Sequence, residues 1–330
     1  MEALMKILLS CVNSLVSLIG YDLEMERAFW YCPSDRLRAC GAAYDGDSLL
    51  IASDNLLTCI TSSGRLSRLI LPGPHENLLH SVHPIGDTGI GVMDTGNSRL
   101  LVYTGSLCDL ADQTTPTVAL SFEPLAGWEN IPADAIHMND FAVTPRGLVA
   151  SCFNYRPYRT VALPSRPWQP LGYGLLLSLE KHKGHNVGRV LAGGLSCPHS
   201  LVWHENRLYC CASATGDFIR FAYNTRGMLV EEETLHITDK HFLRGALPLK
   251  DGDWLLGGSH MRRDEGAGMV LYRLSASGKI TMLPVARSGE IYDILPWRDE
   301  VMRPVAALIS TLPPAFFDGE NVCPPICLLE

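Results

Sequence analysis

The chain has 330 residues, 47% of them hydrophobic, which is enough to bury a large core in one domain or two. Its formal charge is −8, from 27 lysines and arginines against 35 aspartates and glutamates. We therefore expect neither nucleic acid nor an anionic membrane as the main partner, because both reward clustered basic residues.

The first segment of the chain is apolar. Residues 5–20, MKILLSCVNSLVSLIG, resemble the apolar part of a signal peptide. However, Asn13 and several serines interrupt this run, and no small-residue cleavage site precedes Tyr21. We interpret the segment as strands. No apolar run of the sequence is long enough to cross a bilayer as a helix, so we expect a soluble protein.

One short pattern recurs along the rest of the chain. Its six copies are residues 38–53, 79–94, 138–152, 197–213, 243–259 and 289–297. Each copy has a small or polar leading residue, a short alternating strand, a turn such as Asp45-Gly46 or Asp251-Gly252, and a second apolar strand. Further strand-like runs follow several copies, for example residues 99–105 and 270–285, which indicates a repeat of four strands.

Four-stranded repeats of roughly 40 to 60 residues with few amphipathic helices are typical of a β-propeller. The predicted fold class is all-β, a single six-bladed propeller over residues 1–330. We expect strands from both termini to close the ring, with the N-terminal strands 5–32 completing the last blade together with residues 289–311. Because residues 304–311, PVAALIST, also resemble a strand, seven blades remain an alternative.

The eleven cysteines are an odd number, and several lie in apolar strand-like runs. This distribution favours a reducing cytoplasm over an oxidised secreted scaffold. Cys323 and Cys327 do not have the spacing of a standard zinc knuckle.

Two longer inserts interrupt the repeat, at residues 108–117 and 154–170. Loops of this kind on a rigid scaffold often carry recognition, although a solvated connector explains them equally well.

Parts of the pattern resemble known families. Residues 94–103, DTGNSRLLVY, are similar to the NHL repeat. Residues 139–147, NDFAVTPRG, and 198–209, PHSLVWHENRLY, resemble gluconolactonases, senescence-marker-protein-like lactonases and strictosidine-synthase-like proteins. With KILLSCVN and GEIYDILPW at its ends, the whole chain also resembles an uncharacterised bacterial β-propeller family. Such motifs specify a fold more strongly than a chemistry.

The resemblance to the lactonases implies a divalent metal such as calcium on the propeller axis, held by a Glu, an Asn and an Asp. Glu290 matches the Glu, but His199 replaces the Asn and Arg244 replaces the Asp. An arginine cannot bind a cation, so the sequence favours an anionic ligand without a metal. A metal held by Glu290, His199 and Asn139 is the alternative.

The polar residue at the start of each inner strand is predicted to line a central funnel. The expected catalytic residues are His199, Glu290 and Asp140, and the expected substrate-binding residues are Arg244, His80, His137, Asn139, Asp217 and Arg262. Two or more imidazoles facing carboxylates suit acid/base chemistry. The same residue types also cap turns and strand ends, which is the purely structural alternative.

No serine-hydrolase elbow, Walker loop, dinucleotide fingerprint or zincin motif is present in the sequence. We therefore predict an enzyme that acts on a small anionic metabolite in the funnel as a hydrolase, lyase or isomerase. The alternatives are a metal-dependent lactonase-like hydrolase and a non-catalytic propeller that binds a ligand or a protein.

Overall fold

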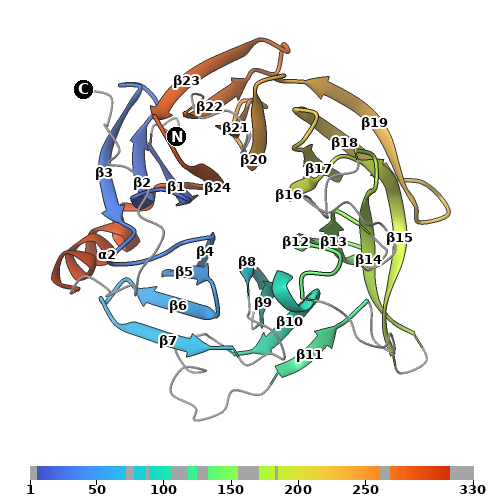
Figure 1. The fold of residues 1–330 in the computed structure, drawn as a ribbon, viewed down its shortest axis with the longest axis horizontal. Coiled ribbons are helices and arrows are strands. Elements are labelled where there is room, and N and C mark those ends of the chain that lie inside the picture. Colours follow the sequence, from blue (N-terminus) through green and yellow to red (C-terminus); the bar gives the residue numbers. More distant parts are fainter. Residues whose placement is uncertain are drawn as a thin grey trace.

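The structure, a computed structural model, describes residues 6–71, 78–86, 89–105, 118–124, 133–154, 171–182, 185–260 and 268–312. Six four-stranded sheets are arranged around a central axis (Figure 1). The protein is therefore a six-bladed β-propeller, as the sequence predicted.

Each blade is one sheet, numbered here in chain order from the blade that holds the N-terminal strands. Blade 1 contains β24 (Glu290–Pro296), β1 (Lys6–Val12), β2 (Val16–Asp22) and β3 (Arg27–Pro33). Blade 2 contains β4 (Gly41–Asp45), β5 (Ser48–Ser53), β6 (Leu56–Thr61) and β7 (Leu66–Ile70). Blade 3 contains β8 (Leu79–Ile85), β9 (Gly89–Asp94), β10 (Arg99–Thr104) and β11 (Val118–Phe122), with the short 3-10 helix η1 (Thr95–Asn97) after β9.

The other three blades follow the same order. Blade 4 contains β12 (Met138–Thr144), β13 (Gly147–Cys152), β14 (Gly174–His182) and β15 (His185–Leu195). Blade 5 contains β16 (Pro198–His204), β17 (Arg207–Ala212), β18 (Asp217–Tyr223) and β19 (Leu229–His236). Blade 6 contains β20 (His241–Pro248), β21 (Trp254–His260), β22 (Met269–Leu274) and β23 (Ile280–Ala286).

The ring closes in blade 1, where the last strand of the chain pairs with the first. β24 runs antiparallel to β1, with Leu9 opposite Ile294 and Val12 opposite Glu290. The predicted closure by strands from both termini is thus confirmed. It places Glu290 at the inner end of blade 1, beside the first strand of blade 6.

The segment after β24 differs from the prediction, because residues 304–311 belong to a helix and not to a strand. Helix α2 (Asp299–Thr311) lies outside the ring beside blades 1 and 2 (Figure 1). Its buried residues are Val301, Met302, Val305 and Ile309, spaced along one helical face, and they join a core with Leu18, Leu49 and Ile51. Arg36 Nη1 donates hydrogen bonds to the carbonyls of Ile309 and Ser310 at 3.0 and 2.8 Å.

Neighbouring blades bury both faces of each sheet, which explains the continuous apolar runs in the sequence. In β5, for example, Leu50 packs into the core between blades 2 and 3. Leu49 and Ile51 point the other way, into the core that includes α2. Alternate side chains of the strand therefore pack into two different cores. The hydrophobic core of the molecule consists of the apolar layers between neighbouring blades, which we call seams.

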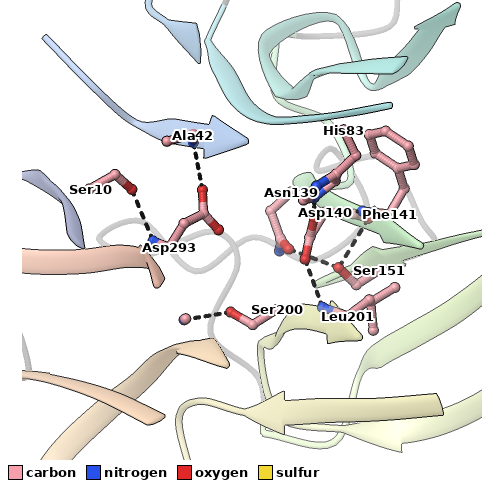
Figure 2. Close-up of polar contacts among 11 residues, drawn as sticks. Ser10, Ala42, His83, Asn139, Asp140, Phe141, Ser151, Ser200, Leu201 and Asp293 are labelled. Carbon is pink, nitrogen blue, oxygen red and sulfur yellow. Dashed lines mark hydrogen bonds and ion pairs between the residues drawn. The ribbon is translucent and has the colours of Figure 1, made fainter. Parts of the chain in front are cut away.

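Polar side chains cross these seams close to the axis and bind the backbone of the next blade (Figure 2). Two of them donate to a backbone carbonyl: Asn139 to that of Pro198 (3.0 Å) and Ser213 to that of Leu243 (2.5 Å). The other four accept from a backbone amide: Asp140 from that of Leu201 (2.7 Å), Ser200 from that of Gly245 (2.7 Å), Ser259 from that of Ile291 (3.0 Å) and Asp293 from that of Ala42 (2.8 Å). Because buried backbone groups need partners, these contacts hold the blades in register.

A break in strand register occurs near the start of five inner strands, at Leu79/Ser81, Met138/Asp140, His199/Val202, Arg244/Ala246 and Ile291/Asp293. The extra residues include Ser200 and Gly245, which adopt positive φ angles of 56° and 71°. A bulge bends its strand and changes the direction of the adjacent side chains. These bulges lie at the positions where the sequence predicted functional residues.

Candidate axial site

Seven side chains at the inner ends of the blades form a closed circuit of ring contacts, which we call the axial ring. The guanidinium of Arg244 lies 4.4 Å from the ring of Tyr292 and 4.7 Å from that of Phe242. The circuit continues through Tyr292–His80 (5.5 Å), His80–His137 (5.1 Å), His137–Phe153 (4.2 Å), Phe153–His199 (4.8 Å) and His199–Phe242 (5.3 Å). Five blades contribute to it.

Blade 2 contributes no side chain to the axial ring. A Cβ atom on Gly41 would lie 2.4 Å from the carbonyl oxygen of His80, so a larger residue cannot occupy this position without a backbone shift. This close approach brings β4 against β8, which carries His80 into the ring.

Arg244 and Glu290 form a buried ion pair in this ring. Arg244 Nη1 donates to Glu290 Oε2, and both side chains are only 4% exposed. Asn13 Nδ2 donates to the other carboxylate oxygen at 2.6 Å. Burial disfavours the guanidinium charge, but Tyr292 and Glu290 outweigh it, so the pKa of Arg244 is raised. The charge of Arg244 is therefore kept and is balanced by Glu290.

His199 is held through one ring nitrogen. Its Nδ1 lies 3.0 Å from the Cys197 carbonyl and 2.8 Å from Ser213 Oγ, which itself donates to the Leu243 carbonyl. A carbonyl oxygen can only accept, so Nδ1 carries the hydrogen. Burial, then the charges of Arg244 and His137, lower the pKa of His199 well below its usual value. At neutral pH the imidazole is neutral, with a lone pair on Nε2.

Some buried nitrogens of this site have no hydrogen-bond partner among the described residues. Two of them are His199 Nε2, an acceptor, and Arg244 Nε, a donor. Both side chains pack against Phe242. Unsatisfied buried polar atoms are rare in folded proteins, because each costs about 1–3 kcal/mol. A ligand at this site would need a donor for His199 Nε2 and an acceptor for Arg244 Nε.

Five predicted site residues meet here: His199, Glu290, Arg244, His80 and His137. His137 Nδ1 also lies 2.9 Å from Asp134, so a carboxylate orients its ring. The other predicted residues lie elsewhere. Asn139 and Asp140 bridge the seam between blades 4 and 5. Asp217 pairs with His236 on the outer strand of blade 5 at 2.8 Å.

Arg262 lies outside the described residues. So do the first insert, residues 108–117, and the part of the second insert that follows Asn154, up to residue 170. The sequence interpretation missed Phe153, Phe242, Tyr292 and Ser213. A usable signal existed for two of them, since Phe242 and Tyr292 stand two positions from Arg244 and Glu290 on the same strands. Residues two apart share one side of a strand.

Three further titratable side chains are drawn in Figure 2, where His83 and Asp140 lie side by side and Asp293 lies across from them with its carboxylate on Ala42. His83 Nε2 is 3.1 Å from Asp140 Oδ1. Burial raises the pKa of Asp293 to about 7, with Asp140 adding to the rise and His83 opposing it. Although burial opposes the charge of His83, its hydrogen bond to Asp140 and the charge of Asp293 raise the pKa of His83.

The residues present do not fit the divalent metal that the lactonase resemblance implied. Among the described residues, no group of three or more His, Cys, Asp or Glu side chains is placed to hold a metal ion. The Arg244 guanidinium lies on the Glu290 carboxylate, where a cation would have to bind. Asn139 Oδ1 accepts from Ser151 at 2.8 Å. The expected ligands Glu290 and Asn139 therefore already have other partners.

No family model matches the sequence, and no curated protein matches it either. Solved structures do. A protein of unknown function from Bacteroides caccae is 14% identical, with a TM-score of 0.60 over 89% of this chain and 98% of its own. The calcium-binding protein regucalcin from Agrobacterium tumefaciens is 15% identical, with a TM-score of 0.51 over 74% of this chain and 73% of its own.

A luciferin-regenerating enzyme is 12% identical, with a TM-score of 0.53 over 77% of this chain and 78% of its own. At such low identities these likenesses establish the fold alone. At the level of the fold they confirm the predicted resemblance to an uncharacterised propeller and to lactonase-like propellers, among whose relatives we count regucalcin. Within the described part of the chain, no helix is long and apolar enough to cross a membrane.

Proposed function

We propose that the protein is an enzyme that acts on a small metabolite in the axial site by acid/base chemistry, with His199 as the base. The observation that carries this proposal is the pair of unsatisfied atoms, His199 Nε2 and Arg244 Nε, against the ring of Phe242. The proposed metabolite has a carbonyl or carboxylate oxygen that accepts from Arg244 and a proton that His199 removes.

The ion pair refines the expectation of an anionic ligand. Glu290 already balances the charge of Arg244, so a carboxylate would add a second anion to one cation. A carbonyl oxygen needs only the hydrogen bond from Arg244 Nε. We therefore place a neutral carbonyl compound first and a carboxylate second.

The proposed step moves one proton. His199 Nε2 takes a proton from water, whose oxygen attacks the carbonyl carbon, or from a carbon next to the carbonyl. Negative charge then develops on the carbonyl oxygen, where Arg244 Nε donates a hydrogen bond. In hydrolysis the tetrahedral intermediate then collapses, the bond from the carbonyl carbon to the leaving oxygen breaks, and His199 returns the proton to that oxygen. In elimination the proton goes to the leaving group, and in isomerisation it goes to another atom of the enolate. Burial and the charge of Arg244 disfavour the imidazolium and so favour this return. This chemistry serves hydrolysis, elimination or isomerisation.

The test compares D-glucono-1,5-lactone with D-gluconate, a neutral carbonyl probe and its carboxylate. Lactone hydrolysis is followed as acid release at constant pH, and binding of both probes by calorimetry. We expect His199→Ala to keep lactone binding and to lose turnover by about a hundredfold or more. His204→Ala is the matched control, since His204 lies at the other end of β16. Equal loss in both variants contradicts the proposal for this probe class.

A non-catalytic ligand-binding propeller is the second candidate, favoured by the aromatic and imidazole side chains of the axial ring. The same experiment separates the two. A binder holds the probe equally in the wild type and in His199→Ala and releases no product.

We also propose a cytoplasmic location. Eight described cysteines are thiols, and burial raises the pKa of several of them, for example that of Cys40 to about 12. Thiol titration under denaturing conditions without reductant should find nearly all eleven cysteines reduced. Recovery of several native disulfides contradicts this location.

A further inference from the structure

We propose that Ser213 is a positioning residue that fixes which nitrogen of His199 carries the hydrogen. This inference deepens the proposed function and rests on it for its catalytic meaning, although the tautomer itself can be measured without a substrate.

The hydroxyl of Ser213 has one hydrogen and donates it to the carbonyl of Leu243 on β20, at 2.5 Å. Toward His199 it therefore presents only lone pairs. Its oxygen lies 2.8 Å from His199 Nδ1, so the hydrogen of this contact belongs to the imidazole. Through this hydroxyl the neighbouring blade thus provides one acceptor beside the Cys197 carbonyl, and both acceptors keep the hydrogen on Nδ1.

Ser213 also holds the second acceptor of His199. Its backbone amide donates to the Cys197 carbonyl at 3.2 Å, and that carbonyl accepts from His199 Nδ1 at 3.0 Å. Cys197 has a φ angle of 53°, in the left-handed region, which a non-glycine residue adopts only when its surroundings hold it there. Both acceptors of Nδ1 are therefore fixed by the same serine.

The consequence lies on the other side of the ring. Once the hydrogen is on Nδ1, Nε2 must present a lone pair, and this is the atom without a partner among the described residues. The opposite tautomer would place a donor there and would remove the proposed base. The position of one imidazole hydrogen thus determines whether His199 Nε2 can accept a proton.

Blade 6 provides a matched control. Ser259 lies near the end of β21, and Ser213 directly follows the end of β17, so the two serines have similar positions in their blades. Both side chains are fully buried. Ser259 Oγ accepts from the Ile291 amide at 3.0 Å and so also bridges a seam. Replacing either serine by alanine removes one buried hydroxyl from a seam, but only Ser213 contacts His199.

The experiment is nitrogen NMR of the full chain labelled with ¹⁵N-histidine, with His199→Gln to identify the His199 signals. In the wild type we expect the hydrogen on Nδ1 and an unprotonated Nε2 at neutral pH. Ser213→Ala removes one of the two acceptors of Nδ1 and keeps the Cys197 carbonyl, so it should raise the population of the form with the hydrogen on Nε2 above that of the wild type. Ser259→Ala should match the wild type. Ser213→Thr, which keeps the hydroxyl, should restore the wild-type pattern where the methyl group is accommodated.

A hydrogen on Nε2 in the wild type overturns the inference, and so does an identical response of the two alanine variants. If Ser213→Ala does not fold, the wild-type tautomer alone decides. The proposed function is tested separately. A protein that has the predicted tautomer but turns over no carbonyl probe supports the role of Ser213 and contradicts the proposed enzyme activity. Where turnover is found, Ser213→Ala should lower kcat with little change in KM.

Discussion

The guanidinium of Arg244, on the innermost strand of blade 6, donates to the carboxylate of Glu290, on the innermost strand of blade 1. This ion pair crosses the seam between blade 6 and blade 1, the blade that contains strands from both ends of the chain. Both partners are almost completely buried. Closure of the ring and electrostatics of the axial site therefore depend on the same two side chains. A change in either residue should alter fold stability as well as the proposed ligand binding, and the two effects must be measured separately.

Removing one member of the pair should be costly. Glu290→Ala leaves the buried guanidinium without its counter-charge, and we expect the free energy of unfolding to fall by about 3–5 kcal/mol. Replacing both residues, Arg244→Met with Glu290→Leu, should cost much less, because no charge then remains buried. Urea unfolding at neutral pH measures both.

The control for this comparison is the exposed pair of Arg38 and Asp54, whose side chains are 47% and 51% exposed. Arg38→Ala should change stability by less than about 1 kcal/mol. A Glu290→Ala variant as stable as the double variant would show that the guanidinium reaches water without its partner.

The fold was predictable because every repeat carries its own local signal. A turn such as Asp45-Gly46 separates two strands that pair directly, with Asp45 opposite Ser48. The closure was predictable because three N-terminal strands lacked an inner strand and residues 290–295 supplied one. Helix α2 was missed because residues 304–311 alone resemble a buried strand, and only Val301 and Met302 complete the helical spacing.

The site was predictable only in outline. The sequence placed His199, Arg244 and Glu290 near the axis, because each begins an inner strand. It could not show that Arg244 binds Glu290, since the contact joins residues 46 positions apart across a seam. Nor could it place Asn139 and Asp140, because the bulge between Met138 and Asp140 changes which neighbour each side chain faces.

Asp140, predicted to be catalytic, should prove important for stability. Its carboxylate accepts from the amides of Phe141 at 2.8 Å and Leu201 at 2.7 Å. Asp140→Ala leaves both buried donors without this acceptor, and we expect a loss of about 2–4 kcal/mol in unfolding free energy. Asp217→Ala is the control, since its partner His236 is half exposed, and it should cost less than about 1 kcal/mol. A catalytic Asp140 would instead lose activity at unchanged stability.

Asp293 should make stability depend on pH near neutrality. Its pKa rises from the usual 3.8 to about 7 in the folded protein, whereas the unfolded chain has the ordinary value. The folded state therefore binds the proton more tightly, and this contribution to stability is lost as the pH rises toward 7 and above. The groups that face Asp293 are His83, Asp140 and the amide of Ala42.

Asp293→Asn removes this titration and keeps an oxygen that can accept from Ala42. We expect the variant to gain stability relative to the wild type when the pH is raised from 5 to 8.5, measured by urea unfolding at both values. Asp251→Asn, at an exposed turn, is the matched control for the replacement of a carboxyl group by an amide. An equal difference between variant and wild type at both pH values contradicts the raised pKa.

Deletion of residues 1–33 should prevent folding, because blade 1 would keep only β24 of its four strands. The deletion removes Leu9 and Ile19 from the core shared with blade 6, and Leu8 and Leu18 from the core shared with blade 2 and α2. Both neighbouring blades would expose an apolar sheet face, because each blade buries its two faces against the blades beside it. We expect insoluble protein without a cooperative unfolding transition. Leu9→Ala, which keeps the strand, should remain soluble and lose about 2–5 kcal/mol. A soluble deletion variant with one cooperative transition would show that five blades fold without the sixth.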